Sequence, residues 1–260
     1  MIKKFFHMVV WGVLVAAVIV ALIFVEQKHN ETICEHFKLN IVNPGHDDLT
    51  DAASLTSLII AGTDTLAGKS LAEISPYDIH LILDKNPYVK YADVQTGIDG
   101  KMEVNVTLRQ AVVRIMNKDG VSYYIDHEGR LMPISPGFPS RVLIINGNIR
   151  DGITGIKDKR LYVDSLSEGS VVRKLFKLAQ YIYKDEFLNK LITQVWMDGN
   201  RDLELIPLIG EHTIKFGDFS DMEDKFEKLT VYYREGAGKA GWIDYRSIDL
   251  RYKNQVICSK

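Results

Sequence analysis

The sequence contains, close to its start, an apolar stretch that is long enough to cross a membrane. Residues 8–25 carry no charged side chain, and Phe5 and Phe6 extend the run toward the N-terminus. A helix rises about 1.5 Å per residue, so about 20 apolar residues span a hydrocarbon core of roughly 30 Å. We therefore expect a transmembrane helix over residues 8–25.

The charges that flank this stretch indicate its orientation. Lys3 and Lys4 precede it, and basic flanks stay in the cytoplasm. We expect a cytoplasmic tail at residues 1–7 and a polar linker at 26–34, with the rest of the chain outside. A cleaved signal peptide is the main alternative, but its apolar core is about 7–15 residues long and ends in small residues. A buried globular helix is the other alternative.

The rest of the chain has the composition of an ordinary folded protein. The whole sequence has 260 residues, of which 46% are apolar and 25% charged, with a net charge of −2. These values argue against a disordered chain and against a nucleic-acid-binding protein, which would show a basic face. Two cysteines, Cys34 and Cys258, exclude a disulfide scaffold or a cysteine-rich zinc fold. We expect both thiols to be unpaired, although an oxidising compartment would permit a disulfide.

Residues 35–110 have the pattern of a small α+β domain. We expect a strand at 37–42, helices at 47–60 and from Ser75 to Pro87, and strands at 89–95 and 101–109. Ser75 and Pro76 suit the N-cap and first turn of the second helix. The strand at 101–109 alternates strictly between apolar and polar residues, which is typical of a sheet with one covered face. Two helices can cover one face of this β-α-α-β-β unit.

Residues 111–260 favour a larger, mostly antiparallel β domain with two or more helices. Glycine and aspartate turns separate short strands, a spacing typical of hairpins. A helix is expected over 170–187, and a capping box at 220–223 predicts another. The expected strands are 112–116, 121–125, 130–134, 141–145, 191–197, 202–206, 212–216 and 242–252, with 255–258 extending or pairing with the last. The fold class is therefore α+β behind a transmembrane helix.

Motifs of common enzyme families are absent. The chain has no G-x-S-x-G, no Walker A and no H-E-x-x-H sequence. A catalytic set assembled in space would leave no such motif, but nothing in the sequence favours one. We therefore predict a non-enzyme with no catalytic residues and no cofactor.

Two patterns imitate ligand sites. Residues 236–241 spell G-x-G-x-x-G, but an expected helix precedes them and a strand follows, the reverse of a dinucleotide site. We expect a loop there. The acidic residues Asp218, Asp221, Glu223 and Asp224 would suit calcium, but they lack EF-hand spacing. Carboxylates in a first helical turn also complement the helix dipole, so we predict no metal site.

Several stretches together resemble the bacterial cell-division family FtsQ/DivIB. They are Asn86-Pro87-Tyr88-Val89, Arg109-Gln110, the segment from Tyr124 to Gly129, and the segment from Tyr245 to Tyr252 with its Asp249-Leu250-Arg251-Tyr252. The resemblance covers nearly the whole chain in order. One departure is that the family often has glycine soon after the final Arg-Tyr, where this chain has Lys253-Asn254-Gln255. The resemblance implies a POTRA-like domain at 35–110 and a β domain at 111–260.

The resemblance also implies a function. It is that of a non-enzymatic scaffold of the division complex in the inner membrane, with a cytoplasmic N-terminus and a periplasmic C-terminal domain at the septum. The implied partners are small coiled-coil division proteins of the FtsB/FtsL type, and other division membrane proteins through the POTRA domain and anchor. Alternatives are a POTRA-bearing component of an outer-membrane assembly or secretion pathway, and a membrane-anchored cell-wall hydrolase.

Strand addition to the C-terminal strand would join these partners. A terminal strand with one unpaired side offers N–H and C=O groups to an incoming segment, and Tyr and Arg are frequent interface hot spots. Ile248 and Leu250 are equally explained as core residues, and the strand as an ordinary sheet edge. The expected partner-binding residues are Tyr245, Arg246, Ile248, Leu250, Arg251, Tyr252 and Val256.

Overall fold

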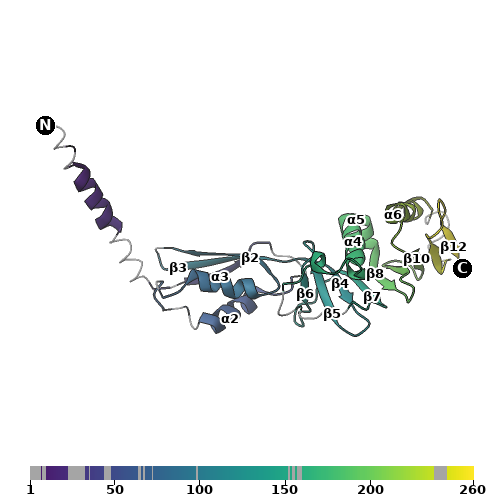
Figure 1. Cartoon of the computed structure of the whole chain (residues 1–260), viewed down its shortest axis with the longest axis horizontal. Coiled ribbons are helices and arrows are strands. Elements are labelled where there is room, and N and C mark those ends of the chain that lie inside the picture. Colours follow the sequence, from purple (N-terminus) through teal and green to yellow (C-terminus); the bar gives the residue numbers. More distant parts are fainter. Residues whose placement is uncertain are drawn as a thin grey trace. The chain divides into compact units, whose positions relative to one another are not determined.

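The computed structural model forms two compact units, one comprising Met1–Pro44 and Thr50–Leu108 and the other Gly45–Leu49 and Arg109–Lys260. Figure 1 shows their helices and strands, labelled where there is room. The structure describes residues 7, 10–22, 33–34, 36–43, 48–63, 66, 68–71, 73–97, 99–151, 153, 156, 160–236 and 245–260.

The first unit has the predicted β-α-α-β-β order. Its central strand β3 pairs in parallel with β1 and antiparallel with β2, so the sheet order is β1-β3-β2. The helices α2 and α3 lie together beside this sheet (Figure 1). The elements are β1 (His36–Ile41), α2 (Ala52–Thr63), α3 (Pro76–Lys85), β2 (Val89–Thr96) and β3 (Lys101–Leu108).

The alternation in β3 builds the core of this unit. Met102, Val104 and Val106 have no exposed side-chain surface and join the cluster that contains apolar residues of α2 and α3. The predicted start of α3 is confirmed, because the Ser75 side chain accepts a hydrogen bond from the Asp78 amide. The predicted start of α2 is wrong. That helix begins at Ala52 rather than at residue 47, and the Asp51 carboxylate accepts the Ser54 amide at 2.8 Å.

The second unit contains a mixed sheet. Nine described strands follow the order β12-β11-β10-β9-β8-β7-β4-β5-β6. They are β4 (Ala111–Met116), β5 (Ser122–Asp126), β6 (Leu131–Pro133), β7 (Leu143–Gly147), β8 (Ile192–Met197), β9 (Leu203–Pro207), β10 (Thr213–Gly217), β11 (Ser247–Asp249) and β12 (Ile257–Ser259).

The pairing of β7 differs from the predicted run of hairpins. β4, β5 and β6 form antiparallel hairpins as expected, but β7 lies beside β4 and pairs in parallel with both β4 and β8. Parallel neighbours require a crossover connection. The helices α4 (Val171–Lys184) and α5 (Glu186–Leu191) supply it between β7 and β8 and pack against the sheet (Figure 1).

Two further helical segments complete this unit. The 3₁₀ turn η1 (Val163–Ser165) precedes α4, and α6 (Met222–Val231) continues into the π-helical segment η2 (Tyr232–Gly236). The predicted capping box at 220–223 is wrong. Asp221 occupies the N-cap in the left-handed region, with φ 48°, and makes no side-chain cap. Ser220 instead bonds to the Asp218 carboxylate.

The expected membrane span falls partly outside the described residues. Residues 10–22 form a helix, while 8–9 and 23–25 are not described. None of the helices in the described parts of the chain combines the length and the hydropathy needed to cross a membrane. Most of the glycine-rich stretch, 237–241, also lies outside the described residues.

Candidate partner-binding edge

The C-terminal end of the sheet differs in part from the sequence-based prediction: a final segment pairs with the preceding strand, as expected for 255–258, but that preceding strand is much shorter than predicted. Instead of a long strand over 242–252, only β11 is formed, and residues 241–244 are outside the described part. Both sides of β11 are paired, in parallel with β10 on one side and antiparallel with β12 on the other. The expected vacancy along residues 245–252 is therefore wrong. Within the described strands, the last position in the sheet belongs to β12.

Local contacts turn the chain from β11 back into β12. The Arg251 guanidinium donates to both oxygens of Asp249, the shortest bond being 2.6 Å, and these bonds hold the pKa of Asp249 below its usual value. The Arg251 stem packs over Gly217, where a Cβ would lie 2.7 Å from Arg251 Cγ. Asn254 then adopts a left-handed conformation with φ 58°. Arg251 therefore shapes the turn that creates the β12 edge.

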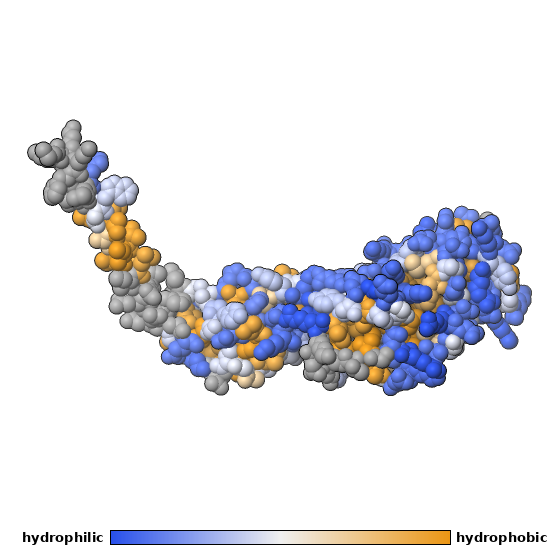
Figure 2. Space-filling view, in the orientation of Figure 1, coloured by the Kyte–Doolittle hydropathy of each residue, from blue (hydrophilic) through white to orange (hydrophobic). Residues whose placement is uncertain are grey.

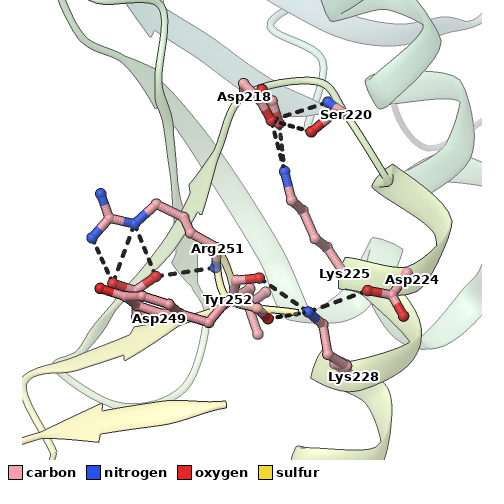
Figure 3. A network of polar contacts seen from close by, with 9 residues as sticks. Asp218, Ser220, Asp224, Lys225, Lys228, Asp249, Arg251 and Tyr252 are labelled. Carbon is pink, nitrogen blue, oxygen red and sulfur yellow. Dashed lines mark hydrogen bonds and ion pairs between the residues drawn. The ribbon is translucent and has the colours of Figure 1, made fainter. Parts of the chain in front are cut away.

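Helix α6 holds this turn through the side chain of Lys228 (Figure 3). Lys228 Nζ donates to the carbonyl oxygens of Leu250 and Tyr252, at 3.2 and 2.8 Å, and pairs with Asp224 at 3.2 Å. Main-chain carbonyls that leave the sheet after β11 thus find a donor on the helix. These contacts tie the β11–β12 connection to α6.

Two members of the acidic cluster, Asp218 and Asp224, pair with lysines of α6. The Asp218 carboxylate accepts hydrogen bonds from Ser220 and from buried Lys225, which lower its pKa to about 2. Asp224 pairs with Lys228, and Glu223 lies in the first turn of α6. No group of residues suited to hold a metal ion is present in the described ranges.

The predicted partner-binding residues divide into buried and accessible ones. Ile248 and Leu250 are fully buried in the core, so these two predictions need correction, because their side chains do not reach the surface. Arg246 is exposed, Tyr252 is 47% exposed, and Tyr245 and Val256 are half-buried. The alternation along this stretch reflects core packing on one side.

Sequence reasoning missed the two residues that β12 presents outward. Ile257 and Ser259 are exposed, whereas Val256 and Cys258 pack against the core. Burial, followed by a hydrogen bond with Cys258, raises the pKa of Tyr232 to about 12, so η2 contacts the inner face of this strand. The signal in the sequence is that side chains of a strand alternate between its two faces, which separates Ile257 and Ser259 from Val256 and Cys258.

A cavity of about 400 Å³ lies beside this edge, between α6 and the residues that lead into β12. Val231, Tyr232 and Val256 supply its apolar lining, and Asp224, Glu227, Lys228, Asn254 and Gln255 supply the polar part. An added strand would therefore find both main-chain partners and a side-chain pocket. Cys258 and the buried Cys34 are free thiols.

Comparison with protein families identifies the unit that carries this edge. The model described as FtsQ/DivIB, C-terminal related, matches residues 110–259, which include every strand from β4 to β12. No curated protein matches the chain. The family match covers more than half of the 260 residues, and the chain belongs to the FtsQ/DivIB family of bacterial cell-division proteins.

Proposed function

We propose that this chain is a membrane-anchored, non-enzymatic scaffold of the division complex that binds small coiled-coil proteins of the FtsB/FtsL type by strand addition. The observation that carries the proposal is the position of β12 at the end of the described sheet, with β11 as its neighbour. An edge strand leaves every second N–H and C=O group free for another chain. Main-chain bonds then supply affinity, and alternate side-chain pockets supply specificity.

The residues around β12 support a specific rather than a general contact. Ile257 presents 39% of its surface on the outer face, and the cavity lined by Val231, Tyr232 and Val256 accepts an apolar side chain. Tyr252 and Arg246 border the hairpin with the side-chain types that dominate interface energies. We retain Tyr245, Arg246, Tyr252 and Val256 as proposed contacts and assign Arg251 a supporting role.

The exposed apolar surface of the N-terminal helix supports the anchor. Trp11, Val13, Val20 and Leu22 are each more than 60% exposed, and Figure 2 shows this segment as a hydrophobic stretch. Water is an unfavourable environment for such a surface, whereas lipid tails would cover it. We propose a span over 8–25, a cytoplasmic N-terminus, a periplasmic C-terminal unit and an inner-membrane location at the septum. The POTRA-like first unit and the anchor would contact other division membrane proteins.

Photocrosslinking in dividing cells tests the proposed edge. A photoreactive amino acid at position 257 or 259 should give crosslinks to small coiled-coil division proteins, because these side chains lie on the exposed face of β12. Position 208 is the matched control, since Leu208 is 65% exposed on the loop between β9 and β10. Equal crosslinks from position 208, or none from 257 and 259 in correctly localised protein, would contradict the proposal.

A second candidate is a role in outer-membrane assembly or secretion, which the β-α-α-β-β topology of the first unit favours. Localisation of a fluorescent fusion separates the two functions. A midcell ring supports the division scaffold, and a uniform envelope signal supports the alternative.

A further inference from the structure

A buried charge cluster joins the β5–β6 hairpin to Arg109, which precedes β4, and it is remote from β12 in the strand order. Arg109, Asp126 and Arg130 are at most 7% exposed. Arg109 takes both nearby acids, because its guanidinium donates to Asp126 Oδ2 at 2.7 Å and to Glu128 Oε2 at 2.9 Å. Both carboxylates therefore pair with Arg109, and Asp126 acts on the Arg130 guanidinium only through its charge.

The second oxygen of Asp126 is occupied by the main chain. Asp126 Oδ1 accepts the backbone N–H groups of Glu128 and Arg130, each at 2.9 Å. The Arg130 guanidinium makes no hydrogen bond or ion pair to any residue in the described parts of the chain, and its Nε is buried without a partner. Arg130 is thus a cation with 95% of its surface buried and no side-chain acceptor among the residues that the structure describes.

This arrangement is energetically unusual. A guanidinium stays protonated in proteins, and a buried charge is costly unless it is paired and hydrogen-bonded. The two arginines differ accordingly. Burial, reinforced by the positive charge of Arg109, lowers the pKa of Arg130. Burial also acts to lower the pKa of Arg109, but the hydrogen bonds that its guanidinium donates to Asp126 and Glu128, together with the charge of Asp126, outweigh it and raise the pKa.

A tyrosine stands beside the unpaired guanidinium. Arg130 and Tyr162 are partners in an isolated antiparallel bridge, and opposite residues of such a pair project to the same side. The Tyr162 side chain is also close enough to both guanidinium groups to favour their charged forms, acting to raise the pKa of each arginine. A phenol and a guanidinium are donors that together suit an anionic oxygen acceptor.

We propose that Arg130, with Tyr162, binds an oxyanion, either a phosphate or a carboxylate group, at the β5–β6 hairpin. Asp126 and Glu128 pair with Arg109. The ligand would therefore supply the negatively charged partner that Arg130 lacks. The planar guanidinium fork matches either group in a bidentate manner. The site is independent of strand addition at β12, so either one can fail without the other.

Thermal unfolding of the full chain in detergent micelles tests the site. Sodium phosphate, sodium acetate and sodium chloride are compared at equal ionic strength, so that general screening is constant. At ten times its dissociation constant, the preferred anion should raise Tm by about 3–5 °C over chloride. A response to phosphate alone identifies a phosphate site, and a response to acetate identifies a carboxylate site. Equal Tm values in all three salts would overturn the proposal.

Variants locate the effect. Arg130→Gln should abolish the anion-specific rise in Tm, while the exposed control Arg201→Gln should keep it. A rise that persists in Arg130→Gln would overturn the assignment. If that variant does not fold, Arg130→Lys keeps the charge but loses the fork, and should weaken the anion response at least threefold. Line broadening of inorganic phosphate in ³¹P NMR, titrated with wild-type and Arg130→Lys protein, gives a second readout, and identical curves for the two would overturn the proposal.

Discussion

The two edges of the large sheet are finished in different ways. At the β6 edge, Leu131 and Met132 are buried, the strand ends at Pro133, and the Leu131 amide donates to the Leu161 carbonyl at 2.9 Å. A neighbouring segment and a proline thus block that edge. At the other edge, β12 has exposed residues and β11 as its only neighbour among the described strands.

The ion pairs near the two edges also differ in burial, and the pair near β6 is the more buried one. Arg109 and Asp126 are bound in a buried pair close to β6, whereas Arg251 and Asp249 form a pair in which the arginine side chain is 44% exposed. Buried pairs are costly to break, and exposed pairs contribute little. The β6 edge is therefore covered by a neighbouring segment, whereas the charge pair beside β11 and β12 is partly exposed. The proposed strand addition at β12 requires such a difference between the edges.

The largest effect is expected from removing the open edge. Deletion of residues 256–260 removes β12 and should abolish co-purification with the small coiled-coil partners, because the strand that receives them is lost. Pull-down from detergent extracts measures the binding, and circular dichroism checks that the remaining sheet is folded. Undiminished co-purification from the folded truncated protein would show that β12 is not the receiving strand.

Matched aspartate substitutions compare the two edges directly. Asp126→Ala should lower the free energy of unfolding by about 3–5 kcal/mol, because it leaves the buried Arg109 without its main partner. Asp249→Ala, next to a partly exposed arginine, should cost only about 1 kcal/mol. Urea unfolding of the full chain in detergent measures both. Equal losses would remove the proposed difference between the edges.

Lys228 offers a test of how α6 holds the turn into β12. Lys228→Met keeps the aliphatic stem but removes the donor to the carbonyls of Leu250 and Tyr252, and should cost about 1–2 kcal/mol. Exchange of the β12 amides should become faster while exchange in β6 is unchanged. Lys190→Met is the control, since that lysine pairs with Glu186 on an exposed surface. Faster exchange in both edges would indicate general destabilisation instead.

The smallest effect concerns pH. His212 precedes β10, and its Nε2 lies 2.6 Å from the hydroxyl of Tyr233, the titratable group it contacts. Burial lowers the pKa of His212, so the unfolded chain binds the proton first, and stability falls as pH decreases below about 6.5. Protonation of this one residue changes the free energy of unfolding by at most about 1.4 kcal/mol per pH unit. Urea unfolding between pH 7 and 5 should show a shallower decline in His212→Gln, and an unchanged slope would exclude His212 as the source.

The sequence pattern predicted the order of elements in the first unit, because the apolar periodicity of each element reflects which of its side chains are buried. The alternation of Met102, Val104 and Val106 specifies a one-sided strand, and Ser75-Pro76 specifies a helix start. The C-terminal edge was predicted only in part: the pairing of a final segment near 255–258 was expected, but the length of the strand before it was wrong. The stretch from Tyr245 to Tyr252 alternates like a long strand, but it ends where the Arg251 side chain closes over Gly217 and Asn254 turns left-handed.

The candidate site was only partly predictable for the same reason. The sequence pattern placed Tyr252 and Val256 near the edge. It also predicted Ile248 and Leu250 as partner-binding residues, but both are buried in the core. The parallel neighbours of β7 and β11 depend on contacts between distant segments, which no local period encodes. Ile257 and Ser259 become the outer face only because β12 folds back on β11.

Residue-resolved hydrogen exchange of the β12 amides, with and without a purified small coiled-coil partner, tests the central claim most directly. In the free protein, the amides at 257–259 should alternate between slow exchange toward β11 and fast exchange toward the open side. Addition of the partner should slow the fast amides, while the β6 amides keep their rates. Fast β12 amides that remain unprotected in a partner-saturated sample would contradict strand addition at this edge.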